Sequence, residues 1–289
     1  MDPTPQTYGV VAIWDAPGPG ERRFGLPSGI AVGADGSVYV ADSENHCVHR
    51  FRPDGTRVAM YGEPGSQKCQ FSRPYGVAVD GSGTLYVADV NNSRVQVLGS
   101  DGGAATQRGK HGNGDGEFFW PHGIALDASG SLFVTDTYNH RVQRLGGRSG
   151  STRVWGGQGD GNGLFNYPVG IAVDGSGDVF VSDENNHCVQ KFTAGCEFLA
   201  RWGGPGGGDG QFSHPRLIAV DAAGNLYVAD GHNHRVQKFA PDGTFLTKWG
   251  QYGTGPGEFR YPCGVAVDAA GNVYVTDSYN RRVQKFAPA

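Results

Sequence analysis

The segment DGHNHRVQ, residues 230–237, gathers residue types that could bind a metal ion or transfer protons. It places Asp230, His232 and His234 close together, with an asparagine and an arginine beside them. Imidazole nitrogens and carboxylate oxygens are zinc ligands, and a histidine near a carboxylate can act as an acid–base pair. Whether these residues form a site depends on the elements that carry them.

The sequence consists of six repeats with a period of 47 residues. The aspartate of the segment above recurs in each copy, as Asp42, Asp89, Asp136, Asp183, Asp230 and Asp277. Phenylalanine, proline and asparagine columns keep the same spacing, and six copies cover nearly all of the 289 residues. The cluster at 230–237 is therefore one copy of a recurring segment.

Each unit holds four short runs with strand character, separated by turn residues. Near the C-terminus these runs read YPCGVAVD, NVYVTD, RRVQKF and FLTKWG, and we name them strands A, B, C and D. Turns such as DAAGN and PDGT join A to B and C to D, and longer glycine-rich stretches join D to A. Four antiparallel strands repeated six times predict an all-β, six-bladed β-propeller without helices.

The ends of the chain indicate how the ring closes. Trp14 shares a column with Trp155, Trp202 and Trp249 of strand D, whereas the C-terminus stops after a strand C. We therefore expect residues 7–14 to supply the outer strand of the last blade. Residues 1–289 should form a single propeller domain, with strand A starting near 28, 75, 122, 169, 216 and 263.

The sequences DGHNHRVQKF, DTYNHRVQRL and P-x-G-I-A-V-D-x-x-G-x-x-Y-V resemble NHL repeats over nearly the whole chain. The resemblance implies a six-bladed propeller, often the recognition end of larger proteins such as TRIM-type ubiquitin ligases and receptor-like bacterial kinases. Members of the family bind proteins or RNA, and a related branch contains a peptide-amidating lyase.

A residue that is identical in all six copies most simply builds the blade, because one ligand on the axis cannot use it six times in the same way. We expect the strand-B aspartate to accept N–H bonds from the B–C turn, and the asparagine three residues later to take the left-handed conformation. The histidine that follows, as in His234, is typical of turn chemistry and packing between blades. The D–A connections lead into strands, so they are not phosphate-binding loops.

Function is expected where the copies differ, on the face formed by the D–A and B–C connections (the D–A/B–C face). Candidate binding residues at the channel mouth follow the repeated proline and are Tyr75, His122, Arg216 and Cys263. Around them we place Arg73, Trp120, Tyr167, His214, Arg260 and Tyr261, with His232 as a further contact. Aromatic residues with arginines are typical of protein hot spots and of surfaces that stack unpaired bases. The alternative is that Trp120, Tyr167 and Tyr261 merely cover the blade tops.

The inner strands do not resemble those of an enzyme. They read GIAVG, GVAVD, GIALD, GIAVD, LIAVD and GVAVD, and are wholly apolar or glycine before the last position. In five of them that position is an aspartate that starts the A–B turn at the opposite end. Zinc takes three or four nitrogen or sulfur ligands, and a hard cation takes several oxygens, but only His122 with either Cys263 or His214 is expected to approach the mouth. Two blades separate Cys263 from His122, which is too far for a nucleophile–base pair. We predict no catalytic residue, no metal ligand and no cofactor.

The net charge, the N-terminal sequence and the cysteine pattern limit the classes of partner and the cellular settings that we expect. The net charge of −4 gives no general attraction to DNA or to an anionic membrane, and the start of the chain lacks a signal-peptide pattern. Five cysteines form no C-x-x-C pair, and Cys47 and Cys188 lie three blades apart, which excludes a disulfide between them. We expect reduced thiols, a monomeric propeller and an intracellular setting, with the compartment and any flanking domains left open.

The leading hypothesis is a non-catalytic module that binds a protein or peptide partner through the D–A/B–C face. RNA binding on the same face is the alternative, and a metal-dependent lyase or hydrolase is the third. Against RNA, the same connections carry acidic residues that offset the arginines, namely Glu21, Asp115, Glu117, Asp160, Asp209 and Glu258.

Overall fold

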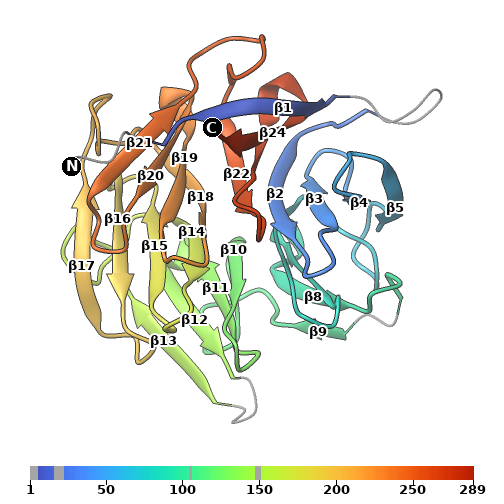
Figure 1. Ribbon diagram of the computed structural model, residues 1–289. Helices are drawn as coiled ribbons and strands as arrows, with labels where there is room; N and C mark the ends of the chain where they lie inside the picture. Colours follow the sequence, from blue (N-terminus) through green and yellow to red (C-terminus); the bar gives the residue numbers. More distant parts are fainter. Residues whose placement is uncertain (1–5, 16–22, 104–105, 147–150) are drawn as a thin grey trace.

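The protein is described by a computed structural model covering residues 6–15, 23–103, 106–146 and 151–289. The predicted all-β fold is confirmed: six four-stranded antiparallel sheets form the blades of a propeller. Figure 1 shows the innermost strands gathered near the middle of the molecule. Among the described residues, no helix is long and apolar enough to cross a membrane.

Each blade runs from an inner strand A to an outer strand D. Strand A is β2 (Pro27–Val32), β6 (Pro74–Val79), β10 (Pro121–Leu126), β14 (Pro168–Val173), β18 (Pro215–Val220) and β22 (Pro262–Val267). Strand B is β3 (Val38–Asp42), β7 (Leu85–Asp89), β11 (Leu132–Asp136), β15 (Val179–Asp183), β19 (Leu226–Asp230) and β23 (Val273–Asp277).

Strand C and strand D complete the blades. Strand C is β4 (Cys47–Phe51), β8 (Arg94–Leu98), β12 (Arg141–Leu145), β16 (Cys188–Phe192), β20 (Arg235–Phe239) and β24 (Arg282–Pro288). Strand D is β5 (Arg57–Tyr61), β9 (Thr106–Arg108), β13 (Thr152–Gly156), β17 (Phe198–Gly203), β21 (Phe245–Trp249) and β1 (Tyr8–Trp14). Four B–C turns contain a single 3-10 turn, η1 (Val90–Asn92), η2 (Thr137–Asn139), η3 (Gly231–Asn233) and η4 (Ser278–Asn280).

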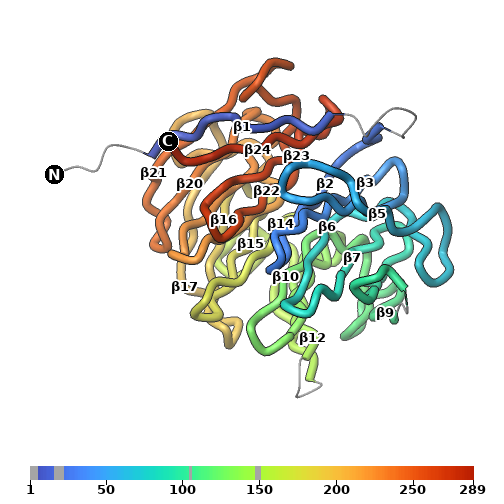
Figure 2. Tube along the Cα trace, turned by 45° about the vertical axis from the view of Figure 1, so that its right-hand side comes forward, coloured from blue at the N-terminus to red at the C-terminus, as the bar shows by residue number. Residues whose placement is uncertain are grey.

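The N-terminal strand closes the ring, as predicted. Strand β1 pairs antiparallel with β24, from Tyr8 opposite Pro288 to Trp14 opposite Val283. Figure 2 shows the two strands side by side at the ends of the colour scale. The last blade therefore takes three strands from the end of the chain and one from its beginning.

The hydrophobic core lies between neighbouring blades. Phe71, for example, is fully buried and packs with Tyr39 and Val48 of the preceding blade as well as with Val87 of its own. On the inner strands the blades approach so closely that a Cβ added to Gly76 would lie 2.2 Å from the carbonyl oxygen of His122. This close approach explains why strand A carries a glycine at this position in five blades. The sixth blade has Leu217 there, and its side chain must lie outside the contact between the two backbones.

Candidate functional site

The buried aspartate at the end of strand B lies beneath the D–A/B–C face and accepts hydrogen bonds from the segments that form it. Asp230 is fully buried, and its Oδ1 accepts the backbone N–H of Ser213 at 2.8 Å. Its Oδ2 accepts bonds from Asn233 at 2.9 Å and from Arg235 at 2.8 Å. The expectation that the B–C turn supplies the backbone donor holds only for the first blade, where the N–H of Asn45 donates to Asp42 at 3.3 Å. In each blade the D–A connection supplies a backbone donor instead or as well.

The left-handed residue of the B–C turn is not the asparagine, which corrects a second expectation. The following residue adopts it, as His234 does with φ of 55°. Asn233 instead uses its side-chain amide to join Asp230 to the carbonyl oxygen of Gly206 at 2.8 Å. The asparagine thus ties the turn to the D–A connection of its own blade.

In four blades, a turn histidine links the blade to the next one. The Nδ1 atom of His234 accepts the backbone N–H of Tyr261 at 3.2 Å. The same bond joins His46 to Arg73, His140 to Tyr167 and His187 to His214, at 3.1–3.3 Å. Burial lowers the pKa of His140, His187 and His234, which favours the neutral imidazole that can accept this bond.

The residues just before the repeated proline have a backbone conformation that large side chains rarely adopt, and the histidine bonds help to fix four of them. The residue before the proline has φ between 53° and 62° in five blades, in Arg73, Trp120, Tyr167, His214 and Tyr261. Non-glycine residues with positive φ are uncommon, and they concentrate at ligand-binding sites where the surrounding structure fixes them. All five were candidate binding residues, and each occupies the same position in its blade with the same backbone conformation.

Residues after the proline meet on the axis and fill it. Tyr75, Val169 and Cys263 are buried and pack with Val90 and Leu217 in one cluster. The hydroxyl of Tyr75 lies 2.8 Å from the thiol of Cys263. The structure thus brings together candidates that the sequence placed around an open mouth, and Leu217, which replaces a glycine, occupies part of the closed axis.

Arg216 is the charged member of this cluster. Its guanidinium lies 5.5 Å from the ring centre of Tyr75 and 5.4 Å from that of Tyr261. It donates to the hydroxyl of Tyr75 and forms an ion pair with Glu184 at 2.5 Å. Burial opposes the charge, but Tyr75 and Glu184 outweigh burial and raise the pKa of Arg216. The axis therefore holds a permanent cation that already has a carboxylate partner.

His122 is a weak candidate for proton transfer. Its Nδ1 lies 2.9 Å from the carbonyl oxygen of Trp120 and 3.0 Å from Oγ1 of Thr137, while Cys263 contacts Tyr75 instead. Burial, followed by the charge of Arg216, lowers the pKa of His122 to about 3. An imidazole with so low a pKa is a poor general base near neutral pH.

A small pocket of about 160 Å³ opens beside the filled axis. Five of the candidate binding residues contribute to its lining, which consists of Leu26, Ser28, Arg73, Tyr75, Arg216, Tyr261, Cys263, Ser278 and Tyr279. Arg73 is exposed at its edge. The Nε of Arg216 is buried and has no hydrogen-bond partner among the described residues.

Two arcs of rings surround the axis. The first joins Trp120 to Tyr138 at 4.7 Å between ring centres and Tyr138 to Tyr167 at 4.9 Å. The second runs from His187 over consecutive contacts of 4.3–5.2 Å through His214, His232, Tyr261 and Tyr279. His232, the exposed histidine of DGHNHRVQ, is thus part of an aromatic surface. Arg260 lies further out, 5.9 Å from the ring centre of Tyr252.

Three residues of this surface escaped the sequence prediction. Glu184 is the one carboxylate in a column that otherwise reads Ser43, Val90, Thr137, Gly231 and Ser278, and this contrast was the available signal. Tyr138 and Tyr279 share the column of His232 and are aromatic there. Of the acidic residues weighed against RNA, Glu21 lies outside the described residues.

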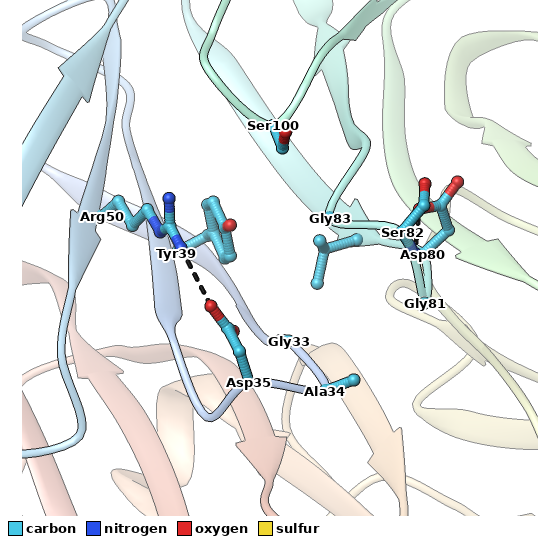
Figure 3. A pocket seen from close by; sticks show the side chains of 11 residues that line it. Gly33, Ala34, Asp35, Tyr39, Arg50, Asp80, Gly81, Ser82, Gly83 and Ser100 are labelled. Atoms are coloured by element: carbon cyan, nitrogen blue, oxygen red, sulfur yellow. Dashed lines mark hydrogen bonds and ion pairs between the residues drawn. The ribbon is translucent and has the colours of Figure 1, made fainter.

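A second pocket of similar size lies at the opposite end, between the A–B turns of the first two blades. Figure 3 shows Asp35 and Arg50 paired on one side of it and Asp80 with Ser82 on the other. The Asp35–Arg50 distance is 2.9 Å, and the guanidinium lies over the ring of Tyr39 at 5.5 Å. None of the candidate residues lines this pocket.

Sequence comparison decides the family. The NHL repeat matches at residues 24–51, 71–98, 118–145, 165–192, 212–239 and 259–286, together more than half of the chain. The chain belongs to the NHL-repeat family. Each match runs from the buried phenylalanine of the D–A connection into strand C, so it contains the aspartate, asparagine and turn residues described above.

The NHL propeller has structural relatives with different activities. A protein of unknown function from Bacteroides thetaiotaomicron is 19% identical with a TM-score of 0.75, over 98% of this chain and 76% of that one. A streptogramin B lyase is 13% identical with a TM-score of 0.67, over 99% and 98%. A gluconolactonase from Xanthomonas campestris is 16% identical with a TM-score of 0.67, over 100% and 96%. At these identities the likeness concerns the fold alone. No curated protein sequence gives a significant match.

Proposed function

We propose that this NHL propeller is a non-catalytic binding module that takes a protein or peptide partner on its D–A/B–C face. The observation that carries the proposal is the two arcs of rings around a filled axis. Tyr279 is 57% exposed and Phe119 36% exposed, so apolar ring surface is available to a partner. Buried aromatic and arginine anchors dominate protein interfaces.

The size of the axial pocket supports a partner that lies across the face. Sites for whole small molecules usually measure roughly 300–1,000 Å³. The pocket beside Arg216 measures about 160 Å³, which suits one anchoring side chain. Glu184 already neutralises Arg216, which leaves Arg73 at the edge as the other charged residue of the pocket lining. The partner's affinity should therefore come mainly from the rings.

Selection from a displayed peptide library tests the proposal. Peptides enriched on the wild-type protein should bind at least about tenfold more weakly to Trp120→Ala/Tyr279→Ala, since both side chains belong to the arcs. Leu199→Ala/Leu246→Ala is the matched control, because it removes exposed apolar side chains from outer strands β17 and β21 instead. Equal loss in both variants, or no enriched peptide, contradicts the proposal.

Binding of RNA to the same face is the alternative to the peptide-binding proposal. A random single-stranded RNA pool should bind weakly, because Arg73 and Arg260 are accompanied by acidic residues on the same connections. Phosphate-driven binding falls steeply with added salt. Tight RNA binding with that salt dependence, abolished in Arg73→Ala/Arg260→Ala, would favour RNA over a peptide. Arg216 is left unchanged because it is buried.

A further inference from the structure

The first blade departs from the others around its buried aspartate. In four blades strand C begins with an arginine whose Nε donates to that aspartate at 2.7–2.8 Å, in the pairs Arg94–Asp89, Arg141–Asp136, Arg235–Asp230 and Arg282–Asp277. Two residues later, a glutamine side chain also donates to the carboxylate. The first blade has Cys47 and His49 at these two positions. Both changes place a metal-binding side chain beside Asp42.

The three side chains form a compact group with the dimensions of a metal site. The thiol of Cys47 lies 3.4 Å from Nε2 of His49, which lies 3.4 Å from Oδ2 of Asp42. All three ligand atoms lie within 4.8 Å of one another, and the residues are 2%, 2% and 0% exposed. Bonds of roughly 2.0–2.3 Å at tetrahedral angles place the ligands of zinc roughly 3.3–3.6 Å apart. Within the described part of the chain, no other group of three such residues is gathered in this way.

The charges around Asp42 favour a cation. In the four blades with arginine, the guanidinium balances the buried carboxylate. Among the described residues, the donors to Asp42 besides His49 are uncharged: the backbone N–H groups of Gly25 at 2.9 Å, Leu26 at 3.0 Å and Asn45 at 3.3 Å, and the side-chain amide of Asn45 at 2.7 Å. A divalent cation bound by one carboxylate and one thiolate is electrically neutral. It would supply the charge balance that a buried carboxylate otherwise obtains from arginine.

The fourth blade is a control that the chain itself provides. It also begins strand C with a cysteine, Cys188, but keeps a glutamine, Gln190, two residues later. Burial raises the pKa of Cys188 to about 12 and that of Asp183 to about 6. A cysteine beside the aspartate without the imidazole therefore favours a protonated, inert thiol.

We propose that Asp42, Cys47 and His49 bind a zinc ion that ties β3 to β4 in the first blade. Thiolate and imidazole ligands favour zinc over magnesium or calcium. Because the group is buried and away from the axis, the ion would stabilise the blade, with solvent as its fourth ligand. Binding would release the thiol proton and move the imidazole proton to Nδ1, so Arg57, whose NH1 lies 3.5 Å from that atom, must turn away.

Metal titration of the purified full chain tests the proposal. After treatment with a chelator, the protein should take up about one zinc per chain and unfold at a higher temperature with zinc present. Cobalt(II) should replace zinc and give the thiolate-to-cobalt charge-transfer band together with the visible bands of tetrahedral cobalt. No uptake by the wild-type protein overturns the proposal.

Three variants locate the ion. Cys47→Arg/His49→Gln rebuilds the network of the second blade, so it should fold and yet bind zinc more than about 100-fold more weakly. Cys188→Ser should keep full affinity and the complete cobalt spectrum. His122→Ala should also keep them, which distinguishes this site from a metal at the channel mouth. An unchanged cobalt spectrum in Cys47→Arg/His49→Gln, or its loss in either of the other two variants, overturns the assignment.

Discussion

The two ends of the propeller are built from the same six repeats but differ in how uniform they are. At the A–B end, five blades cap the turn in the same way, as when Asp174 accepts the N–H groups of Ser176 and Asp178 at 2.9 Å. In five blades a lysine or arginine also lies 5.0–5.5 Å from the centre of a strand-B ring. At the D–A/B–C end, the residues on either side of the proline differ from blade to blade.

This difference distinguishes the repeated residues that build the blades from the varied residues that we propose to contact a partner. Beneath the D–A/B–C face, the same aspartate and asparagine recur in each blade, and a histidine links four of them to the next. The varied residues stand on this constant layer, so they can change without rebuilding the blade. We therefore propose the binding surface at the positions where the six copies differ.

The largest expected effect compares one aspartate from each end. Asp230→Ala removes a buried carboxylate and leaves Arg235, which is 5% exposed, without its ion pair. The free energy of unfolding should fall by about 3–5 kcal/mol. Asp174→Ala removes only a turn cap and should cost about 1 kcal/mol. Urea denaturation measures both, and equal losses would remove the distinction between the layer under the face and the A–B turns.

A smaller effect should appear on acidification. The pKa values of His140, His187 and His234 lie below the ordinary 6.5, so the unfolded chain takes up protons more readily than the folded protein. The free energy of unfolding should therefore decrease as the pH falls below about 6.5. The pKa of Asp183, raised to about 6 by burial, acts in the opposite sense and offsets part of this decrease near pH 6. Urea denaturation at about pH 8 and pH 6 measures the net change, which the three histidines should dominate.

The variant His187→Ser isolates one of these histidine links. It copies Ser93, which takes the same position in the second blade. Loss of the bond to His214 should cost about 1 kcal/mol at about pH 8, and the decrease toward pH 6 should be smaller than in the wild-type protein. An unchanged pH dependence would show that His187 does not contribute to it.

The smallest effect on stability is expected at an exposed ring of the arcs, Tyr279. Tyr279→Ala removes a side chain that is 57% exposed and stacks on Tyr261. Its free energy of unfolding should change by less than about 0.5 kcal/mol, while the affinity for a selected peptide should fall about tenfold. Calorimetric titration and urea denaturation measure the two quantities. A variant that loses stability but keeps affinity would place Tyr279 in the scaffold.

The sequence was sufficient for the fold because a strict period repeats every strand and turn signal six times. It was less informative about the site, because contacts between blades join residues that no motif connects. Glu184 of one blade pairs with Arg216 of the next blade, and no sequence motif near either residue predicts this ion pair. Leu217 was noticed as an exception, but its place in the closed axis depends on Tyr75 and Cys263 from other blades. The conformation of the B–C turn was assigned one residue too early, since asparagine and histidine both tolerate it.

The pairing of β1 with β24 also has a kinetic consequence. Each of the first five blades can form from a continuous stretch of chain, whereas the last blade must join residues near position 8 to residues near position 288. Contacts between residues so distant in sequence form slowly, since the loop between them has to be closed first. During synthesis, the first strand must therefore wait with an unpaired edge until the last one leaves the ribosome. Ring closure should be the final, rate-limiting event of folding.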